Sequence, residues 1–242
     1  MSRSDHDWVK RGKLIVFEGV EGGGKTTQLQ RCSDWLKETS VWLEGGNSLK
    51  DKTPLVVTTR EPGGTLFGTR VRQLLLAAGD EHRDTAPKTR TELLLFAADR
   101  AQHVEEFLKP KLAQGAIILC DRYTDSTIAY QGYGRGIDLK LIEQLNQIAT
   151  GGLESDLTLW LDVDLELGLK RARARGTADR IEQADIEFHR RVQEGFRSLY
   201  QQNPRRIVQV DANSSEQQVH SSIQKILRQR FNEWSSQLSQ PS

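Results

Sequence analysis

The sequence predicts an α/β fold in which a five-stranded parallel sheet is flanked by helices on both faces. Three observations support this prediction. Five short runs rich in β-branched and other apolar residues are spaced along the chain, segments with helical patterns lie between them, and a glycine-rich segment follows the first run. Strands that alternate with helices are typical of parallel sheets, because a crossover helix returns the chain to start the next strand in the same direction.

The predicted elements follow in a regular order. KLIVFE forms the first strand at 13–18 and leads through the glycine-rich segment into a helix at about 25–38. Four further apolar runs are predicted as strands, at 54–59, 116–121, 157–162 and 205–211. Helices are predicted at about 66–78, 88–109, 138–149, 165–175, 186–201 and 214–237. Ligands of such sheets bind at the carboxyl ends of the strands, so we expect functional residues there.

The composition excludes several classes of protein. The chain has 242 residues, with 34 Lys and Arg against 33 Asp and Glu, so its net charge of +1 argues against a general nucleic-acid or membrane binder. No apolar run approaches the roughly 20 residues that span a bilayer, and the N-terminus lacks an apolar stretch of signal-peptide type. Cys32 and Cys120 match no metal-binding spacing and are expected to be buried thiols. We therefore expect a single cytoplasmic domain.

The strongest motif is GVEGGGKT, at residues 19–26, which fits the G-x-x-x-x-G-K-[ST] pattern of a P-loop. A chance glycine-rich turn is disfavoured, because an apolar strand precedes it and a helix follows. Backbone N–H groups of such a loop converge on phosphate oxygens. Lys25 is expected to bridge the terminal phosphates and Thr26 to hold Mg²⁺. The predicted ATP-binding residues of the loop are Gly19, Val20, Glu21, Gly22, Gly23, Gly24, Lys25, Thr26 and Thr27.

Charged pairs follow the second and third strands. TTREPGGT places Arg60 after one strand, and CDRY places Asp121 and Arg122 after the next. A guanidinium matches a phosphate bidentately, and a carboxylate there can anchor magnesium through water. Each pair alone could be a surface salt bridge. Two arginines at adjacent strand ends beside a P-loop favour a site for a second phosphate.

The predicted helix 88–109 adds a candidate for binding a nucleobase. Phe96 and Arg100 are four residues apart and project from the same helical face. The ring could stack on a base while the guanidinium donates to one of its carbonyl oxygens. The alternative is that Phe96 belongs to the core and Arg100 extends along it to reach solvent.

Together these motifs resemble the bacterial thymidylate kinases. GVEGGGKTT, TREPGGT, LFAADR, CDRYTDSTIAYQG, GRGID, SDLTLWLD and RARARG…DRIE occur in the expected order, from Lys13 to about Asp211. The resemblance implies a P-loop nucleoside monophosphate kinase fold with a small lid, a homodimer, and transfer of the γ-phosphoryl group of ATP to dTMP with Mg²⁺. The extension 1–12, the insertion 41–52 and the tail 214–242 fall outside the motifs, and we assign them no role.

The resemblance also implies roles for single residues on the acceptor side. Phe96 would stack on thymine, and Arg100 would donate to its O4. Arg60 and Arg122 would hold the acceptor phosphate, and Glu21 would accept from the 3′-OH of the sugar. The other implied residues are Thr127 at the N3 edge of the base, Ser126 and Gln131 near it, Arg72 in the pocket wall, and Tyr130 against the 2′ position.

The stretch RARARGTADR, at 171–180, begins the predicted lid at about 171–185. In one branch of the family the catalytic arginine lies in the P-loop, but here the loop offers Glu21 before Lys25, which is the pattern of the branch with lid arginines. On a helix, residues two apart point about 200° away from each other, so the stretch forms no single stripe for nucleic acid. Arg175, beside Gly176, is predicted to enter the site. Arg180 is the second choice, whereas Arg171 and Arg173 are expected to face solvent.

Three other functions remain open from the residues alone. A deoxynucleoside kinase accepts a hydroxyl and would not need two arginines around an acceptor phosphate. A P-loop ATPase that binds nucleic acid would use the arginines at 171–180 to contact a phosphate backbone, with strongly salt-dependent binding. A regulatory module would bind ATP without turnover.

Overall fold

The computed structural model of the chain describes residues 11–39, 55–77, 86–174, 176, 180–181 and 183–238. The insertion 41–52, most of the extension 1–12 and Arg175 lie outside the described residues. The strands are β1 (Lys13–Glu18), β2 (Val56–Arg60), β3 (Ile117–Asp121), β4 (Leu157–Asp162) and β5 (Ile207–Asp211). They form one sheet in the order β2-β3-β1-β4-β5, with every pair parallel. The predicted five-stranded parallel sheet is confirmed.

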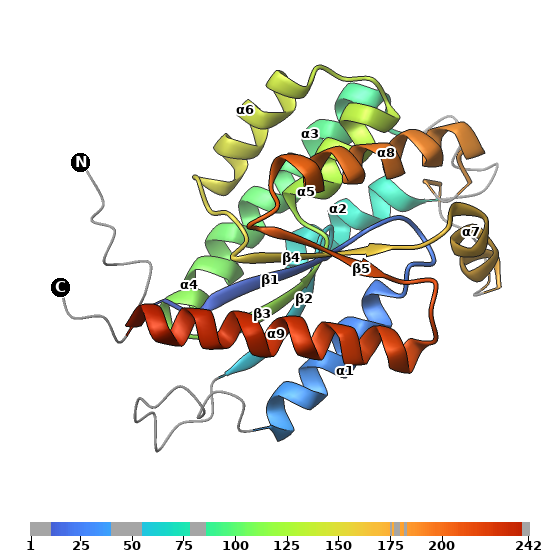
Figure 1. Cartoon of the computed structure of the whole chain (residues 1–242). Coiled ribbons are helices and arrows are strands. Elements are labelled where there is room, and N and C mark those ends of the chain that lie inside the picture. The colour runs from blue at the N-terminus through green and yellow to red at the C-terminus, as the bar shows by residue number, and fades with distance from the viewer. Residues whose placement is uncertain are drawn as a thin grey trace.

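Helices cover both faces of the sheet (Figure 1). α1 (Lys25–Glu38) and α9 (Glu216–Leu238) pack together on one face. The other face carries α3 (Thr89–His103) and α8 (Ile186–Gln202), with α2 (Leu66–Leu76) and α6 (Leu139–Thr150) packed against α3. The short α7 (Leu165–Arg173) follows β4. The central strand β1 is buried from Leu14 to Glu18, as expected for a strand covered by helices on both sides.

The predicted helix 88–109 is not one regular α-helix. α3 ends at His103, a π-helical turn covers Val104–Leu108, and α4 (Lys109–Ala113) completes the segment. Pro110 accounts for the change, because it has no N–H to donate and its ring clashes with the carbonyl four residues earlier. The bounds of β2, β3 and β5 also differ from the prediction by one or two residues.

A helical segment after β3 was not predicted. α5 (Thr124–Thr127) continues into the π-helical Ile128–Gly134, a stretch in which two glycines obscure the helical pattern. Close packing explains one of them. A Cβ at Gly134 would lie 2.6 Å from the ring of Phe188 on α8, so this position favours glycine.

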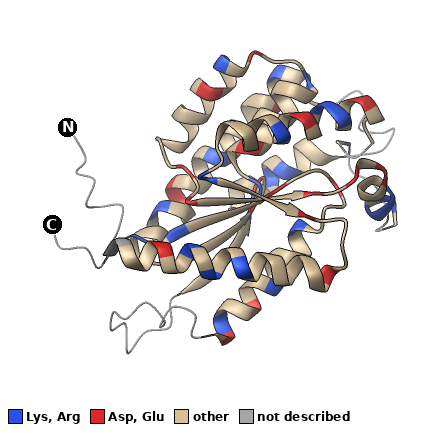
Figure 2. Ribbon diagram, viewed as in Figure 1, with Lys and Arg blue, Asp and Glu red and all other residues tan. Residues whose placement is uncertain are grey.

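Acidic and basic residues are mixed over most of the helices, and basic residues gather in the last turn of α7 (Figure 2). Cys32 and Cys120 are buried, unpaired thiols, as predicted. Among the described residues, no helix is long and apolar enough to cross a membrane.

Candidate active site

The glycine-rich segment joins β1 to α1 through backbone conformations that favour glycine. Gly19 and Gly22 have φ values of 135° and 72°. A Cβ at Gly22 would lie 1.9 Å from the carbonyl oxygen of Gly168, so a side chain does not fit. Lys25 is buried, and its Nζ donates to the carbonyl oxygens of Gly19 and Val20 at 3.0 and 2.8 Å. Burial lowers the pKa of Lys25 to about 8, so the ammonium is still mostly protonated at neutral pH.

The two predicted magnesium-binding residues are in contact. The Thr26 hydroxyl donates to Oδ2 of Asp121 at 2.7 Å. The parallel pairing of β1 and β3 places Asp121 opposite Phe17, next to the start of the P-loop. Hydroxyl and carboxylate oxygens suit Mg²⁺, which often binds one or two protein ligands and keeps several of its waters. The residues present therefore fit the ion.

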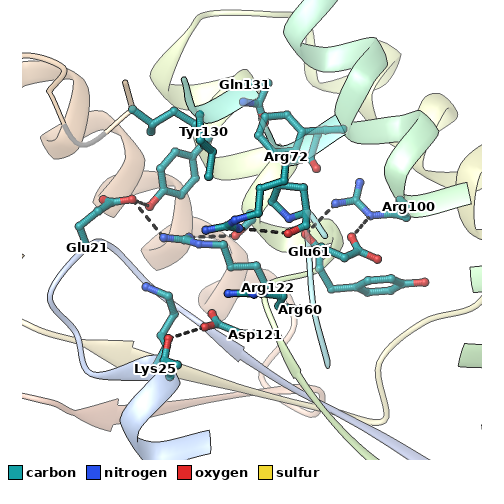
Figure 3. Close-up of a pocket in the computed structure, with 18 of the residues that line it drawn as sticks. Glu21, Lys25, Arg60, Glu61, Arg72, Arg100, Asp121, Arg122, Tyr130 and Gln131 are labelled. Atoms are coloured by element: carbon teal, nitrogen blue, oxygen red, sulfur yellow. Dashed lines mark hydrogen bonds and ion pairs between the residues drawn. The ribbon is translucent and has the colours of Figure 1, made fainter. Parts of the chain in front are cut away.

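A cavity of about 200 Å³ lies at the carboxyl ends of β1, β2 and β3 (Figure 3). Its lining includes most of the predicted site: Glu21, Gly22, Gly24, Lys25, Thr26, Thr27, Arg60, Arg72, Phe96, Arg100, Asp121, Arg122, Ser126, Thr127, Tyr130 and Gln131. Of the predicted site residues that the structure describes, Gly19, Val20, Gly23 and Arg180 do not line it. The fold thus brings P-loop residues and candidate acceptor residues around one cavity.

Arg122 has a left-handed backbone, with φ 72°, which is uncommon for a residue with a side chain. Glu18 supports this turn, because its Oε1 accepts from the backbone N–H groups of Tyr123 and Ser126 at 2.8 and 3.1 Å. The Arg122 guanidinium donates to Ser126 Oγ and to Glu21 Oε1, at 3.1 and 3.0 Å. Arg122, the candidate phosphate-binding arginine, is therefore fixed through both its backbone and its side chain. Burial raises the pKa of Glu18 to about 7.

Glu21 is a buried carboxylate at the cavity wall. Its Oε1 accepts from Arg122 and from the Tyr130 hydroxyl, the latter at 2.6 Å, while Nδ1 of His189 lies 3.4 Å from Oε2. Burial alone would raise the pKa of Glu21, but His189, Arg122 and Lys25 together hold it well below its ordinary value. Glu21 is thus ionised, and it accepts hydrogen bonds without donating any.

Arg100 is 2% exposed, and a network of acceptors holds it at the cavity wall. Its Nε donates to Glu61 Oε2 at 2.8 Å, and its other nitrogens donate to Asn146 Oδ1 and the Tyr123 carbonyl at 2.7 and 3.0 Å. The second oxygen of Glu61 lies 2.9 Å from Nδ1 of the buried His103. Arg100 therefore does not extend to solvent, which was the alternative considered for it.

The other residues that the resemblance assigns to the binding of the acceptor nucleotide differ in their solvent exposure. Phe96 is partly buried and packs against the hydrophobic core while it lines the cavity, so the two interpretations of this ring are compatible. Arg72 donates to the Pro62 carbonyl oxygen at 3.0 Å. Arg60 is exposed at the end of β2 and lines the cavity. Thr127, on α5, is buried and also lines the cavity.

The arginines of 171–180 have separate environments. Arg173 is exposed, as expected, but Arg171 does not face solvent alone. It is partly buried and donates to the carbonyl oxygens of Ala212 and Asn213, at 2.8 and 3.4 Å, because the end of β5 lies next to α7. Arg180 pairs with the buried Glu92 on α3. Arg175 lies outside the described residues.

Sequence reasoning missed five buried polar residues that support the site. None of them was assigned a role from the sequence: Glu18, Glu61, Glu92, His103 and His189. Glu18 directly precedes the P-loop motif at the end of β1, and Glu61 lies within TREPGGT directly after Arg60, so these positions were the one signal in the sequence. The other three lie on helices, where their direction into the protein depends on the tertiary packing.

The fold and the cavity define a P-loop nucleotide-binding protein with the nucleoside monophosphate kinase fold. A family model described as thymidylate kinase matches residues 17–223. The chain belongs to the thymidylate kinase family and is therefore an enzyme, a kinase.

Individual relatives agree with this assignment. The chain is 57% identical over 235 residues to a thymidylate kinase of Cyanothece sp. (strain PCC 7425 / ATCC 29141), covering 95% of this chain and 99% of the relative. It is 57% identical over 223 residues to that of Trichodesmium erythraeum (strain IMS101), covering 92% and 98%. The crystal structure of thymidylate kinase from Ehrlichia chaffeensis superposes with a TM-score of 0.69 at 36% identity, over 89% of this chain and 99% of that one.

Proposed function

We propose that this protein transfers the γ-phosphoryl group of ATP to dTMP, with Mg²⁺, and so forms ADP and dTDP in the cytoplasm. The observation that carries the proposal is that one cavity is lined both by the P-loop and by arginines from β2 and from the segment after β3. Two phosphate-binding groups that face one cavity suit an in-line transfer between two phosphates.

On the donor side, the P-loop binds the phosphates of ATP. Lys25 supplies a positive charge to the terminal phosphates once it exchanges its backbone acceptors for phosphate oxygens. Thr26 and Asp121 hold the magnesium ion, which when bound neutralises charge on the phosphoryl oxygens. Asp121 and Thr26 already lie together, so this arrangement needs no long movement of either side chain.

On the acceptor side, Arg122 and the exposed Arg60 bind the phosphate of dTMP. The ionised Glu21 accepts from the 3′-OH of the deoxyribose, a hydrogen bond that a 3′-deoxy nucleotide cannot make. Phe96 stacks on the base, and Arg100 donates to its O4. The support for Arg100 is that three acceptors fix its guanidinium at the cavity wall, so little side-chain entropy is lost on binding.

The chain acts as a single P-loop kinase domain whose lid is the segment 171–185, and Arg175 of this lid stabilises the charge on the transferring phosphoryl group. The surroundings of two described arginines support this choice. Arg171 is occupied by carbonyl oxygens at the end of β5, and the exposed Arg173 lies on the last turn of α7 before the segment. These surroundings of Arg171 and Arg173 support the choice of an arginine later in the stretch.

The test is an assay with Mg-ATP and a panel of nucleoside and deoxynucleoside monophosphates, in which ADP and the diphosphate product are measured. We expect turnover with dTMP well above that with purine monophosphates. Phosphorylation of thymidine itself would instead indicate a deoxynucleoside kinase, and ATP binding without any turnover would indicate a regulatory module.

We also propose that the enzyme is a homodimer. Large apolar side chains are exposed on α2, α3 and α6, which pack side by side: Leu66, Leu74, Leu94 and Ile148 are 87%, 61%, 53% and 78% exposed. Such a surface suits an interface with a second copy of the chain. Light scattering after size exclusion measures the mass, and Leu74→Glu should shift a dimer to the monomer. A monomeric wild-type protein at micromolar concentration would contradict the proposal.

A further inference from the structure

Glu92 is a carboxylate that the fold buries in the first turn of α3, where its side chain is 1% exposed. It does not line the cavity, and neither its type nor its position marks it in the sequence. Burial of an unpaired charge is very unfavourable, so its partners decide its role.

Those partners come from two separate parts of the chain. Gln131 Nε2 donates to Oε1 of Glu92 at 3.0 Å, and the Arg135 guanidinium lies 3.3 Å from the same oxygen. Arg180, from the lid segment 171–185, donates to Oε2. Burial alone would raise the pKa of Glu92, but the hydrogen bonds from Arg180 and Gln131 more than offset it and leave the pKa lowered. Glu92 is therefore ionised.

An ionised Glu92 fixes the orientation of the Gln131 amide. A carboxylate accepts hydrogen bonds and donates none, so Gln131 has to present its NH₂ group to Glu92 and its carbonyl oxygen elsewhere. Gln131 lines the cavity, and no hydrogen bond from the described part of the chain occupies that oxygen. Glu92 thus makes Gln131 a hydrogen-bond acceptor toward the acceptor side of the cavity.

The same carboxylate docks the lid segment. Besides its pair with Glu92, Arg180 donates through Nε to the carbonyl oxygen of Leu75 near the end of α2, at 3.1 Å. The next residue, Ile181, is buried and lines the cavity. This part of the segment therefore lies against the acceptor side, and its position depends on the Glu92–Arg180 pair.

We propose that Glu92 is a positioning residue that couples the lid segment to the acceptor pocket, through Arg180 on one oxygen and Gln131 on the other. The inference rests on the proposed function and extends it. A change at Glu92 disturbs the docking of the segment and the acceptor pocket together, although Glu92 touches neither substrate.

Kinetics of Glu92→Gln test the effect on the pocket. The amide can donate or accept, so it no longer fixes Gln131, and it removes the charge that holds Arg180. We expect the KM for dTMP to rise by about tenfold or more, with kcat and the KM for ATP within about threefold of wild type. The matched control is Glu143→Gln, the same change at an exposed position on α6, which should behave as wild type.

Limited trypsin digestion tests the docking. Cleavage after the exposed Arg173 should be slowed by dTMP in the wild type, and it should be faster and less dependent on dTMP in Glu92→Gln. If that variant does not fold, Arg180→Met removes the pair from the other side. It should also raise the KM for dTMP and the cleavage rate, and the two substitutions together should be less than additive.

Two outcomes overturn the inference. One is a folded Glu92→Gln with wild-type KM for dTMP and wild-type cleavage. The other is an effect of Arg180→Met on the KM for ATP alone, which would place Arg180 in the ATP site instead. Failure of the wild type to phosphorylate dTMP would contradict the proposed function and is seen before either variant is made.

Discussion

Replacing Arg100 by alanine has two consequences that the structure separates. The substitution removes the donor proposed for O4 of thymine, and it removes the partner of a buried carboxylate. Glu61 would keep its contact with His103 but lose the 2.8 Å hydrogen bond from Arg100. Arg100 and Glu61 are each 2% exposed, so solvent does little to screen the loss.

The size of each effect follows from these contacts. Breaking one side of a buried ion pair costs about 3–5 kcal/mol of unfolding free energy. In a protein of this size, that lowers Tm by roughly 6–20 °C. Loss of one hydrogen bond from a charged donor costs about 1.5–3 kcal/mol in the transition state, or about 10- to 150-fold in kcat/KM for dTMP. The KM for ATP should stay near that of wild type.

The assays are thermal unfolding and steady-state kinetics with each substrate varied in turn. The matched control is the double variant Glu61→Gln with Arg100→Ala, which leaves no unpaired charge. It should recover much of the Tm but none of the dTMP kinetics. A single variant that unfolds at the wild-type temperature would refute the pairing, and a double variant with restored dTMP kinetics would refute the role in base binding.

Three further predictions concern the phosphates and the sugar. Glu21→Gln should lower kcat/KM for dTMP more than for a 3′-deoxy analogue, and equal losses would assign Glu21 another role. Arg175→Ala should lower kcat and kcat/KM together by at least about 10²-fold with little change in KM, whereas Arg173→Ala, at an exposed position, should be near wild type; similar, salt-sensitive losses in both would indicate a diffuse electrostatic effect. Because the pKa of Lys25 is lowered to about 8, its charge is lost as pH rises through that value, so kcat/KM for ATP should fall above about pH 8. A flat profile there would contradict this last prediction.

The sheet and the P-loop could be predicted because their signals are local. Five apolar runs indicate buried strands, and the backbone conformation of the loop favours glycine at Gly19, Gly22 and Gly24, where φ is positive. Asp121 and Arg122 could be placed near the loop because parallel strands end at one edge of the sheet, and the pairing of β1 with β3 agrees with that argument. Each of these inferences needs a pattern within a few residues and one rule of topology.

The supporting carboxylates could not be predicted, because nothing near them in sequence decides whether they are buried. In the sequence, Glu92 is an acidic residue in the first turn of a helix, and such a residue usually faces solvent. It is buried because Gln131 and Arg180, far away in the chain, converge on it. Glu61 depends in the same way on Arg100 and His103. Such residues become visible only when the partners are placed in space.

The surroundings of the arginines in the stretch 171–180 could not be predicted from the sequence either. Its composition suggests that the arginines act together, but the structure gives the described arginines different surroundings. Arg171 donates to the end of β5, Arg173 is exposed, and Arg180 neutralises Glu92. A diffuse patch for nucleic acid would need these side chains to present their charge together, whereas one is used against carbonyl oxygens and another against a buried carboxylate. The described arginines of this stretch therefore act separately, and Arg175 stays the residue that we propose for stabilising the charge on the transferring phosphoryl group.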